Sequence, residues 1–599
     1  MKDFIKMTLA VICGIVILGI LFFVLCIGTI STLAVAGSSQ TVIPKQAVLK
    51  IDMSEIMLAE QSSETDPMAA IKGDNSSVIG LWDAIRALDV AAEDPSIQYI
   101  YLRPEAVANG MSEIYEFRQA LNRFRQSGKP IISYMDNVNN SGYYLASVSD
   151  KIYLTSHEGG IVMLNGICGQ MFFLKDILDK LGVNVQLIRH GKYKSAGEMF
   201  VRNSSSPENM EQNQAMISSM WSQVALEMAN CRMISVERLN DLIDNLKLNS
   251  PEDFLNANLV DGLMTAEELK CKLADLASVE KFKDVKMVSF SDYIGAKVKA
   301  ATGIKQKIAV IYADGEIVDG FDRKEVAGDY LASQIAKVRA DSTVKAVVFR
   351  VNSPGGSVLA SEKIKNEIEL LGEQKPVVAS YGAYAASGGY WISSGCPHIF
   401  ATPLTLTGSI GVFSMIPDIS GTLKDIAHVT FTPVKSNRHA DMYTLMRPLD
   451  SDETAYMQES VENIYGRFVS LVSEGRNLTP EFVDSVAQGR VWTGKEALDI
   501  HLVDELGTLD DAIKYAAEAA SDSIDGADLS LWNVVGYPKP QTTMEMVMEM
   551  FGKTTEENVL SGTPLESVSK ALVNWASSIK DGRKEMTVAR MPFDIVWNN

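Results

Sequence analysis

Apolar residues fill the N-terminal segment 7–36 almost without interruption. This segment is longer than the roughly 20 residues that a helix needs to span a bilayer. It is also longer than the apolar part of a cleaved signal peptide, which is about 7–15 residues, so we expect an uncleaved anchor. Lys2 and Lys6 precede the segment, and no basic cluster follows it closely. The positive-inside rule then places the N-terminus in the cytoplasm and the body of the chain outside.

Beyond this segment, short apolar runs alternate with turn signals and amphipathic stretches, which is the pattern of an α/β protein. Residues 376–381 predict a buried strand, Gly382 lets the chain turn, and the small residues 385–389 allow a helix to begin. Such a turn would lift the hydroxyl of Ser387 into a cleft. The next amide would lie at a helix N-terminus, where an oxyanion is stabilised. A turn that only packs a helix closely against the sheet, with no catalytic role, would give the same pattern. The motif is not a Gly-x-Ser-x-Gly nucleophile elbow, because Ala385 stands at the first glycine position.

The body of the chain contains an internal repeat. Four segments match four later ones in the same order: 94–103 with 341–350, 130–144 with 376–390, 152–155 with 399–402, and 185–195 with 429–436. In the second pair Ser141 falls on Ser387 without a gap. Preserved order indicates two copies of one α/β unit. We therefore expect four parts: an anchor over 1–38, an N-terminal repeat over 39–300, a C-terminal repeat over 301–540, and a tail of unknown role over 541–599.

The two copies differ where chemistry would lie. Gly355 and Gly356 follow a strand of the second copy, and the first copy has no such pair. Glycines can present a backbone amide with no side chain in the way. Two alanines precede Ser387, whereas two asparagines, 139–140, precede the serine of the first copy. Only the second copy therefore has a complete candidate nucleophile site.

Composition and net charge exclude further classes of partner and cofactor. The 599 residues carry a formal net charge of −20, with a pI of about 4.9, so nucleic acid is an unsuitable partner for this surface. The six cysteines include no C-x-x-C pair. We therefore expect neither a zinc site nor a disulfide framework, and no metal or cofactor.

A serine nucleophile needs a base. The six histidines stand in no motif with a carboxylate partner: His157, His190, His398, His428, His439 and His501. A lysine can act as the base when burial lowers its pKa until the amine is neutral.

Sequence order alone does not choose between Lys194 in the first copy and Lys435 in the second. Lys435 lies in the same copy as Ser387, which is the simpler geometry, but a polar run, 437–441, follows it and would keep it hydrated. Lys194 has the small neighbours 195–197, which leave room for a partner surface to cover the amine. We predict that Lys194 reaches Ser387 across the seam between the copies.

Four motifs carry a resemblance to a known family. They are Asn-Ser-Pro-Gly-Gly-Ser at 352–357, Ala-Ala-Ser-Gly-Gly-Tyr-Trp at 385–391, Leu-Thr-Gly-Ser-Ile-Gly-Val at 406–412 and Tyr-Lys-Ser-Ala at 193–196. Together they resemble signal peptide peptidase A in its long, two-domain form, from the anchor to about residue 520. The family often has Asp where Asn352 stands and Val where Gly197 stands, and neither departure removes a catalytic group.

The resemblance implies two crotonase-like domains, a fold shared with the Clp protease subunit, behind a transmembrane helix. It implies a Ser–Lys endopeptidase that clears cut signal peptides from the inner membrane, with its body on the periplasmic side. In that family pattern Ser387 is the nucleophile and Lys194 the base, and the amides of Gly355 or Gly356 and of Gly388 form the oxyanion hole. It also implies a homotetramer in contact with lipid, whose apolar peptide substrate lies extended along a strand edge, for which residues 407–412 are a candidate.

Two other functions fit parts of the pattern. Another crotonase-type acyl-transfer enzyme would use the same turn, although a membrane anchor argues against it. A catalytically silent membrane scaffold would use only the oligomer, and the intact serine and diglycine argue against that.

Overall fold

The computed structural model describes residues 42–63, 76–298 except 106 and 108, 303–521 except 324, 528–542, 545 and 586–590. The predicted anchor over 7–36 lies outside these residues, as do positions 299–302 around the expected boundary between the copies. Within the ranges just given, no helix is both long and apolar enough to cross a membrane.

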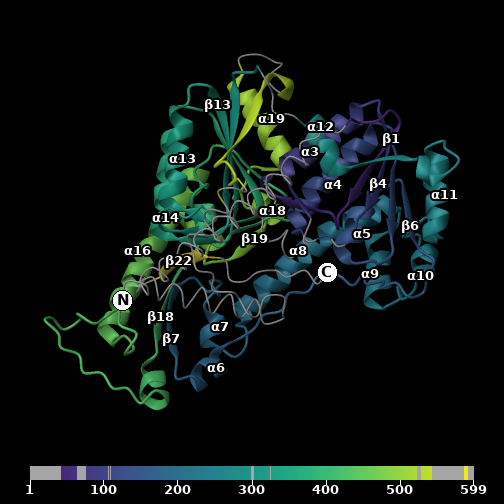
Figure 1. Ribbon diagram of the computed structural model, residues 1–599. Helices are drawn as coiled ribbons and strands as arrows, with labels where there is room; N and C mark the ends of the chain where they lie inside the picture. The colour runs from purple at the N-terminus through teal and green to yellow at the C-terminus, as the bar shows by residue number, and fades with distance from the viewer. Residues whose placement is uncertain are drawn as a thin grey trace, which may run out of the picture.

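The first copy is built on a parallel sheet of six strands (Figure 1). In spatial order these are β8 (Gly262–Met264), β6 (Lys151–Thr155), β5 (Ile131–Met135), β4 (Ile97–Arg103), β1 (Ala47–Asp52) and β9 (Lys286–Ser289). A separate short parallel pair joins β2 (Ile56–Ala59) to β3 (Ser77–Gly80). The helices of this half are α3 (Leu81–Glu93), α4 (Met111–Gln126), α5 (Asn140–Ala146), α6 (Lys175–Lys180), α7 (Glu198–Val201), α8 (Pro207–Arg232), α9 (Val236–Asp244), α10 (Pro251–Asn256), α11 (Ala266–Leu276) and α12 (Phe290–Lys297).

The second copy repeats this plan on an eight-stranded sheet. Its main path is β19 (Val491–Thr493), β17 (Leu406–Gly408), β15 (Val377–Ala386), β13 (Val344–Ser353), β10 (Lys307–Asp314) and β21 (Asn533–Tyr537). Off this path, β16 (Ile399–Ala401) pairs with β15, and β20 (Glu505–Leu506) pairs with β16. Its helices are α13 (Gly328–Ala340), α14 (Val358–Gly372), α15 (Gly388–Trp391), α16 (Ser451–Arg476), α17 (Pro480–Val486), α18 (Gly494–Asp499) and α19 (Leu509–Ala520). The α/β class predicted for both copies is confirmed, whereas their exact limits stay predictions.

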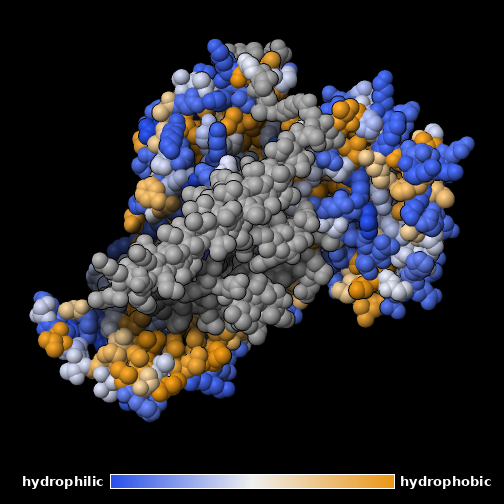
Figure 2. Space-filling model, viewed as in Figure 1, coloured by the Kyte–Doolittle hydropathy of each residue, from blue (hydrophilic) through white to orange (hydrophobic). Residues whose placement is uncertain are grey.

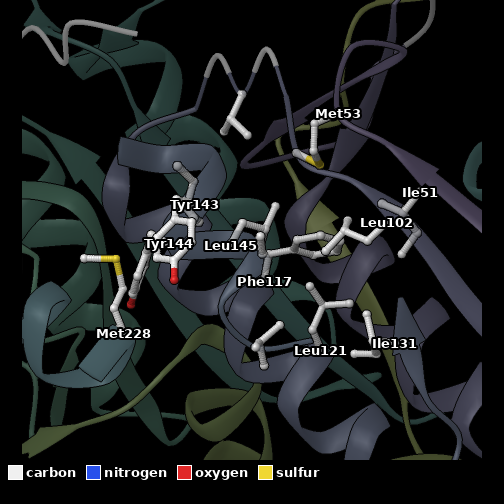
Figure 3. Packing of buried hydrophobic residues seen from close by; sticks show 14 of the residues in the cluster. Ile51, Met53, Leu102, Phe117, Leu121, Ile131, Tyr143, Tyr144, Leu145 and Met228 are labelled. Carbon is white, nitrogen blue, oxygen red and sulfur yellow. The ribbon is translucent and has the colours of Figure 1, made fainter. Parts of the chain in front are cut away.

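Continuous apolar runs explain why these central strands are parallel and internal. All the residues of β5 and nearly all those of β10 and β13 are buried. Helices cover both faces of a parallel sheet, so the side chains on both faces of its strands are buried. The sequence of such a strand is therefore a continuous apolar run. In the first copy, Phe117 and Leu121 of α4 point into the same core as Leu102 and Ile131 from the sheet (Figure 3). The spacing of four along α4 places both side chains on one face of that helix.

A third sheet joins the two copies. Its order is β12 (Val326–Ala327), β11 (Ile317–Val318), β14 (Gly355–Ser357), β22 (Met586–Arg590), β18 (Val412–Asp418) and β7 (Asn184–His190). β7 of the first copy pairs antiparallel with β18 of the second over seven residue pairs, from Val412 opposite His190 to Asp418 opposite Asn184. This pairing brings the segment after β7 beside the second copy.

Two expectations from the sequence are wrong. Residues 429–436 form no strand, although they match β7 in sequence; all eight are exposed, and β18 is the strand that lies beside β7. Residues 407–412 are also not one strand. β17 ends at Gly408, Ser409 has a φ of 50°, and β18 begins at Val412, because the left-handed backbone at Ser409 turns the chain. β17 is paired on both sides, so it offers no free edge for a peptide.

Arg350, near the end of β13, ties the second copy to the first through buried charges. Its guanidinium donates to both carboxylate oxygens of Glu60 at 2.7 and 3.0 Å and to Glu116 at 2.6 Å. It also donates to a hydroxyl and a carbonyl of β15 at 3.0 and 3.1 Å. The second oxygen of Glu116 accepts the amide that begins α19, at 2.7 Å. The three charged side chains are at most 2% exposed, so each depends on the others for its solvation.

We expect Arg350→Ala to lower the free energy of unfolding in urea by about 3–5 kcal/mol, because two buried carboxylates lose their cation. Arg103 ends the equivalent strand of the first copy, where its side chain is 35% exposed and pairs with Glu105. Arg103→Ala is therefore the matched control and should cost about 0–1 kcal/mol. Equal losses in the two variants would contradict the argument.

Candidate functional site

Ser387 stands at the turn between β15 and α15, as the small-residue pattern predicts. Its φ is 57° and its ψ −115°, which is a strained backbone for a residue with a side chain. Glycines follow because no other residue fits. A Cβ on Gly388 would lie 3.1 Å from the amide nitrogen of Gly356, and one on Gly389 would lie 2.5 Å from the carbonyl oxygen of Ser353. The same turn thus produces the close packing and fixes the position of the serine side chain.

Lys194 of the first copy reaches Ser387 of the second. Its Nζ lies 2.6 Å from Ser387 Oγ. The same nitrogen lies 2.9 Å from the carbonyl oxygen of Ser409 and 3.0 Å from its hydroxyl oxygen. Ser387, Lys194 and Ser409 are all fully buried. The hydrogen bonds to Ser409 fix the direction of the amine, so that it faces the nucleophile.

Burial lowers the pKa of Lys194 well below its usual value of 10.5, because the charged amine has lost its water. Among the ion pairs of the described residues, none involves this lysine, and no carboxylate contributes to the shift in its pKa. A neutral amine beside a hydroxyl can accept the proton of that hydroxyl, which is the task of a general base.

The second copy also encloses the lysine from its other side. The chain turns at Gly191, which has a φ of 102°, and the amide of Tyr193 donates to the carbonyl of Gln488 at 2.9 Å. A Cβ on Gly489 would lie 2.6 Å from Lys194 N, and one on Gly411 would lie 3.2 Å from Lys194 Cδ. These close approaches exclude water from the amine.

A polar network holds the backbone on either side of Lys194. Arg189 donates to the Lys194 carbonyl at 2.9 Å and to Glu198 at 3.1 Å. Ser195 does not orient the amine, because its hydroxyl donates to Asn209 at 2.8 Å. Ser409 performs that role and was missed as a site residue. The sequence signal was its place in the Leu-Thr-Gly-Ser motif at 406–409.

The competing lysine Lys435 and the neighbouring Lys192 lie elsewhere. Lys435 forms an ion pair with Asp441 at 3.0 Å. Lys192 is exposed, and its amine lies 4.9 Å from the centre of the Tyr193 ring. Of the three, only Lys194 is brought to Ser387.

The diglycine lies beside the nucleophile turn. Gly355 and Gly356 have φ values of 104° and 153°. A Cβ on Gly356 would lie 1.9 Å from the Ile317 carbonyl, so a side chain there is excluded. The Gly355 amide donates to Ser353 Oγ at 3.3 Å, whereas the Gly356 nitrogen lies against Gly388. The structure therefore gathers all three glycines predicted for an oxyanion hole around Ser387.

The first copy lacks this arrangement: it has no diglycine, and a side chain occupies the amide that corresponds to that of Gly388. Asn139 Oδ1 accepts the amide of Gly142 at 2.7 Å. Gly142 is the residue after Ser141, and so corresponds to Gly388. An amide that is already bonded to a cap is not directed at an oxyanion. The serine of the first copy is 1% exposed and lies 3.9 Å from the sulfur of Met111.

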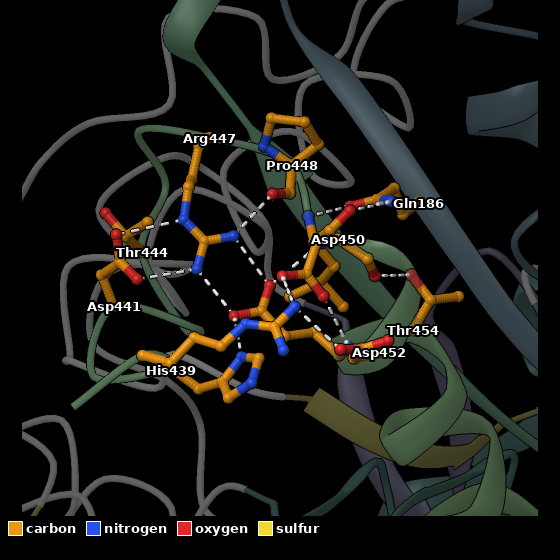
Figure 4. A network of polar contacts seen from close by, with 12 residues as sticks. Gln186, His439, Asp441, Thr444, Arg447, Pro448, Asp450, Asp452 and Thr454 are labelled. Carbon is orange, nitrogen blue, oxygen red and sulfur yellow. Dashed lines mark hydrogen bonds and ion pairs between the residues drawn. The ribbon is translucent and has the colours of Figure 1, made fainter.

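Within the described part of the chain, one trio could hold a metal ion: His439, Asp450 and Glu453, with ligand atoms within 4.8 Å of one another. Arg447 donates to both oxygens of Glu453 at 2.7 Å and also binds Asp441 (Figure 4). Its hydrogen bonds lower the pKa of Glu453 to about 2. The guanidinium already neutralises this carboxylate, so we assign no metal there.

Comparison with known proteins gives the site its context. The sequence matches Peptidase family S49 over residues 123–280 and 369–522. The chain belongs to peptidase family S49. One matched range lies in each copy, and together they include Lys194 and Ser387, although not the diglycine.

The S49 relatives extend over most of the chain. Protease 4 of Salmonella typhi is 38% identical over 78% of this chain and 75% of its own. The chloroplastic serine protease SPPA of Arabidopsis thaliana is 30% identical over 78% of this chain and 68% of its own. A putative signal peptide peptidase SppA of Enterococcus faecium is 36% identical over 35% of this chain and 62% of its own. The resemblance expected from the four motifs is confirmed, and this S49 protein is a serine protease.

Lys194→Met should make this S49 peptidase more stable at neutral pH. The unfolded chain protonates this lysine below a pH near 10.5, whereas the buried amine stays neutral down to a much lower pKa. Between these values the unfolded state holds more protons, so the stability of the native enzyme rises with pH by about 1.4 kcal/mol per unit. Methionine removes that dependence.

The stability gained by Lys194→Met should therefore shrink as the pH is raised toward 10.5. Urea unfolding of both proteins across this pH range measures the difference. Lys192→Met is the matched control, because it makes the same substitution at an exposed lysine two residues away. The same slope in both variants would show that the amine of Lys194 is not buried neutral.

Proposed function

We propose that this S49 protein is a membrane-anchored endopeptidase with a Ser–Lys dyad, and that it degrades cleaved signal peptides from the extracytoplasmic side. The observation that carries the proposal is the 2.6 Å contact between Lys194 Nζ and Ser387 Oγ in a fully buried site. A serine is activated when a base lies within hydrogen-bond reach of its hydroxyl and a third group orients that base.

The chemistry follows from these positions. Lys194 takes the hydroxyl proton as Ser387 Oγ bonds to the carbonyl carbon of the scissile peptide. The amide of Gly388 and one amide of the diglycine hold the oxygen, which becomes negative in the transition state. The protonated lysine then gives its proton to the leaving amine. Water attacks the resulting ester, with Lys194 again as base, and releases the acyl half of the peptide. Ser409 keeps the amine aligned through both steps.

Two features support a membrane setting. Residues 7–36 form an apolar run long enough to span a bilayer, and the basic residues Lys2 and Lys6 precede it. Apolar side chains also gather on the lower lobe, around α6, α7, β7 and β18 (Figure 2). Phe172, Ile177 and Leu181 there are 40%, 53% and 48% exposed. A surface of this kind fits contact between subunits, as in the proposed homotetramer, or with lipid.

The proposal of a signal peptide as the substrate rests on the same membrane setting. A cleaved signal peptide is apolar, short and unfolded, and an anchored enzyme meets it at the membrane. A crotonase-like arrangement of the two copies is part of this proposal. The Enterococcus faecium relative is named for the same activity.

The dyad is tested by matched substitutions in the two copies. Ser387→Ala and Lys194→Ala should each lower kcat by about 10³-fold or more, and the double variant should be little worse, because the pair acts as a unit. The equivalent serine and the competing lysine supply the controls: Ser141→Ala and Lys435→Ala should stay within a few-fold of the parent. A fluorophosphonate probe should label the parent at Ser387. An inactive Lys435→Ala beside an active Lys194→Ala would place the site within the second copy alone.

Topology is tested separately. Protease added to intact spheroplasts should digest the body of the full chain, and alkaline carbonate should not release it from membranes. A chain that starts at residue 42 is the control, and carbonate should release it. Protection of the full chain from the protease would refute the proposed orientation.

A further inference from the structure

A strand from the C-terminal tail lies between the two edges that flank the nucleophile. β22 pairs antiparallel with β14 through Ser357 opposite Val588, Gly356 opposite Ala589 and Gly355 opposite Arg590. On its other side it pairs antiparallel with β18, through Phe413 opposite Val588 and Met415 opposite Met586. It also contacts α15, the helix that begins after Ser387. Figure 1 shows β22 at the centre of the molecule.

These edges would otherwise be open. β14 is paired with β11 on its far side, and β18 with β7 on its far side. Among the described strands, β22 alone joins the two facing edges. An open edge presents unpaired amides and carbonyls, which recruit an extended chain. A groove with such an edge on each side recognises the backbone of a peptide, whatever its sequence.

The register brings the tail to the reacting position. β22 runs from Met586 beside Met415 toward Arg590 beside Gly355. Ala589 and Arg590 therefore lie opposite the diglycine, one of whose amides is proposed to hold the oxyanion. The Gly356 amide in turn lies against Gly388, the residue after the nucleophile. A peptide substrate cannot occupy this groove while β22 is in it.

We infer that residues 586–590 are a built-in occupant of the substrate groove, which must leave before a peptide can bind. This inference rests on the proposed function, because it takes the groove beside Ser387 as the substrate site. The tail and the substrate then compete for the same backbone groups. Such competition multiplies the apparent KM by one plus the ratio of closed to open groove, and it leaves kcat unchanged.

Removal of the segment is the first test. A chain that ends at residue 585 should have a KM several-fold lower than the full chain, with kcat within about two-fold. A synthetic peptide of residues 586–599 should inhibit the shortened enzyme competitively, and a scrambled peptide should not. An unchanged KM in the shortened enzyme would overturn the inference.

Two substitutions in the full chain separate backbone pairing from other effects of the tail. Val588 pairs on both edges, and proline has no N–H to donate, so Val588→Pro should lower KM as the truncation does. Val588→Thr keeps the N–H and the β-branched shape, and should behave like the parent. Equal shifts in the two variants would overturn the inference.

The state of the tail gives an independent readout. Intact mass of the parent and of Ser387→Ala is measured before the kinetics. Cleavage between residues 588 and 591 in the parent alone would support a tail that reaches the nucleophile. Failure of the fluorophosphonate probe to label Ser387 in the shortened enzyme would refute the proposed function. Labelling with an unchanged KM would refute only the role of the tail.

Discussion

The site depends on one desolvated amine. Burying a lysine without a carboxylate costs free energy, because the charged form loses its water and the neutral form must be deprotonated first. Lys194 is held in that state by groups from both copies. The first copy supplies β7 and the turn at Gly191, and the second supplies Ser409, Gly411 and Gly489 around the amine. A single copy would leave one side of this lysine in water.

Arg350, a second buried basic side chain, shows the opposite solution to the same problem. Arg350 is as buried as Lys194, but Glu60 and Glu116 lie against it. Because guanidinium does not lose its proton in proteins, it needs these partners to remain charged in the interior. The arginine therefore joins the copies as a structural ion pair. The lysine, which has no such partner, is free to exchange a proton with a hydroxyl.

The asymmetry of the copies has a local physical cause. In the second copy the turn after β15 leaves the amide of Gly388 at the start of α15, beside the diglycine. In the first copy Asn139 caps the equivalent amide of Gly142. The cap stabilises α5, and it also removes the donor that an oxyanion would need. The capped amide and the missing diglycine together explain why Ser141 has no oxyanion site beside it.

The sequence by itself determined the features that depend on neighbours along the chain. Apolar runs predicted the parallel strands, the repeat predicted two α/β units, and the small residues at 385–389 predicted the turn at Ser387. The preference for Lys194 over Lys435 came from local polarity, which the exposed ion pair of Lys435 with Asp441 matches. Only the tertiary structure decided what meets across long distances. The pairing of β7 with β18, the turn of Ser409 toward the amine, the Arg350 network and the position of β22 all join segments far apart in sequence. Strand pairing and buried ion pairs depend on which segments the fold brings together. The residues that form them follow no periodic pattern or fixed spacing along the chain, so the sequence does not reveal them.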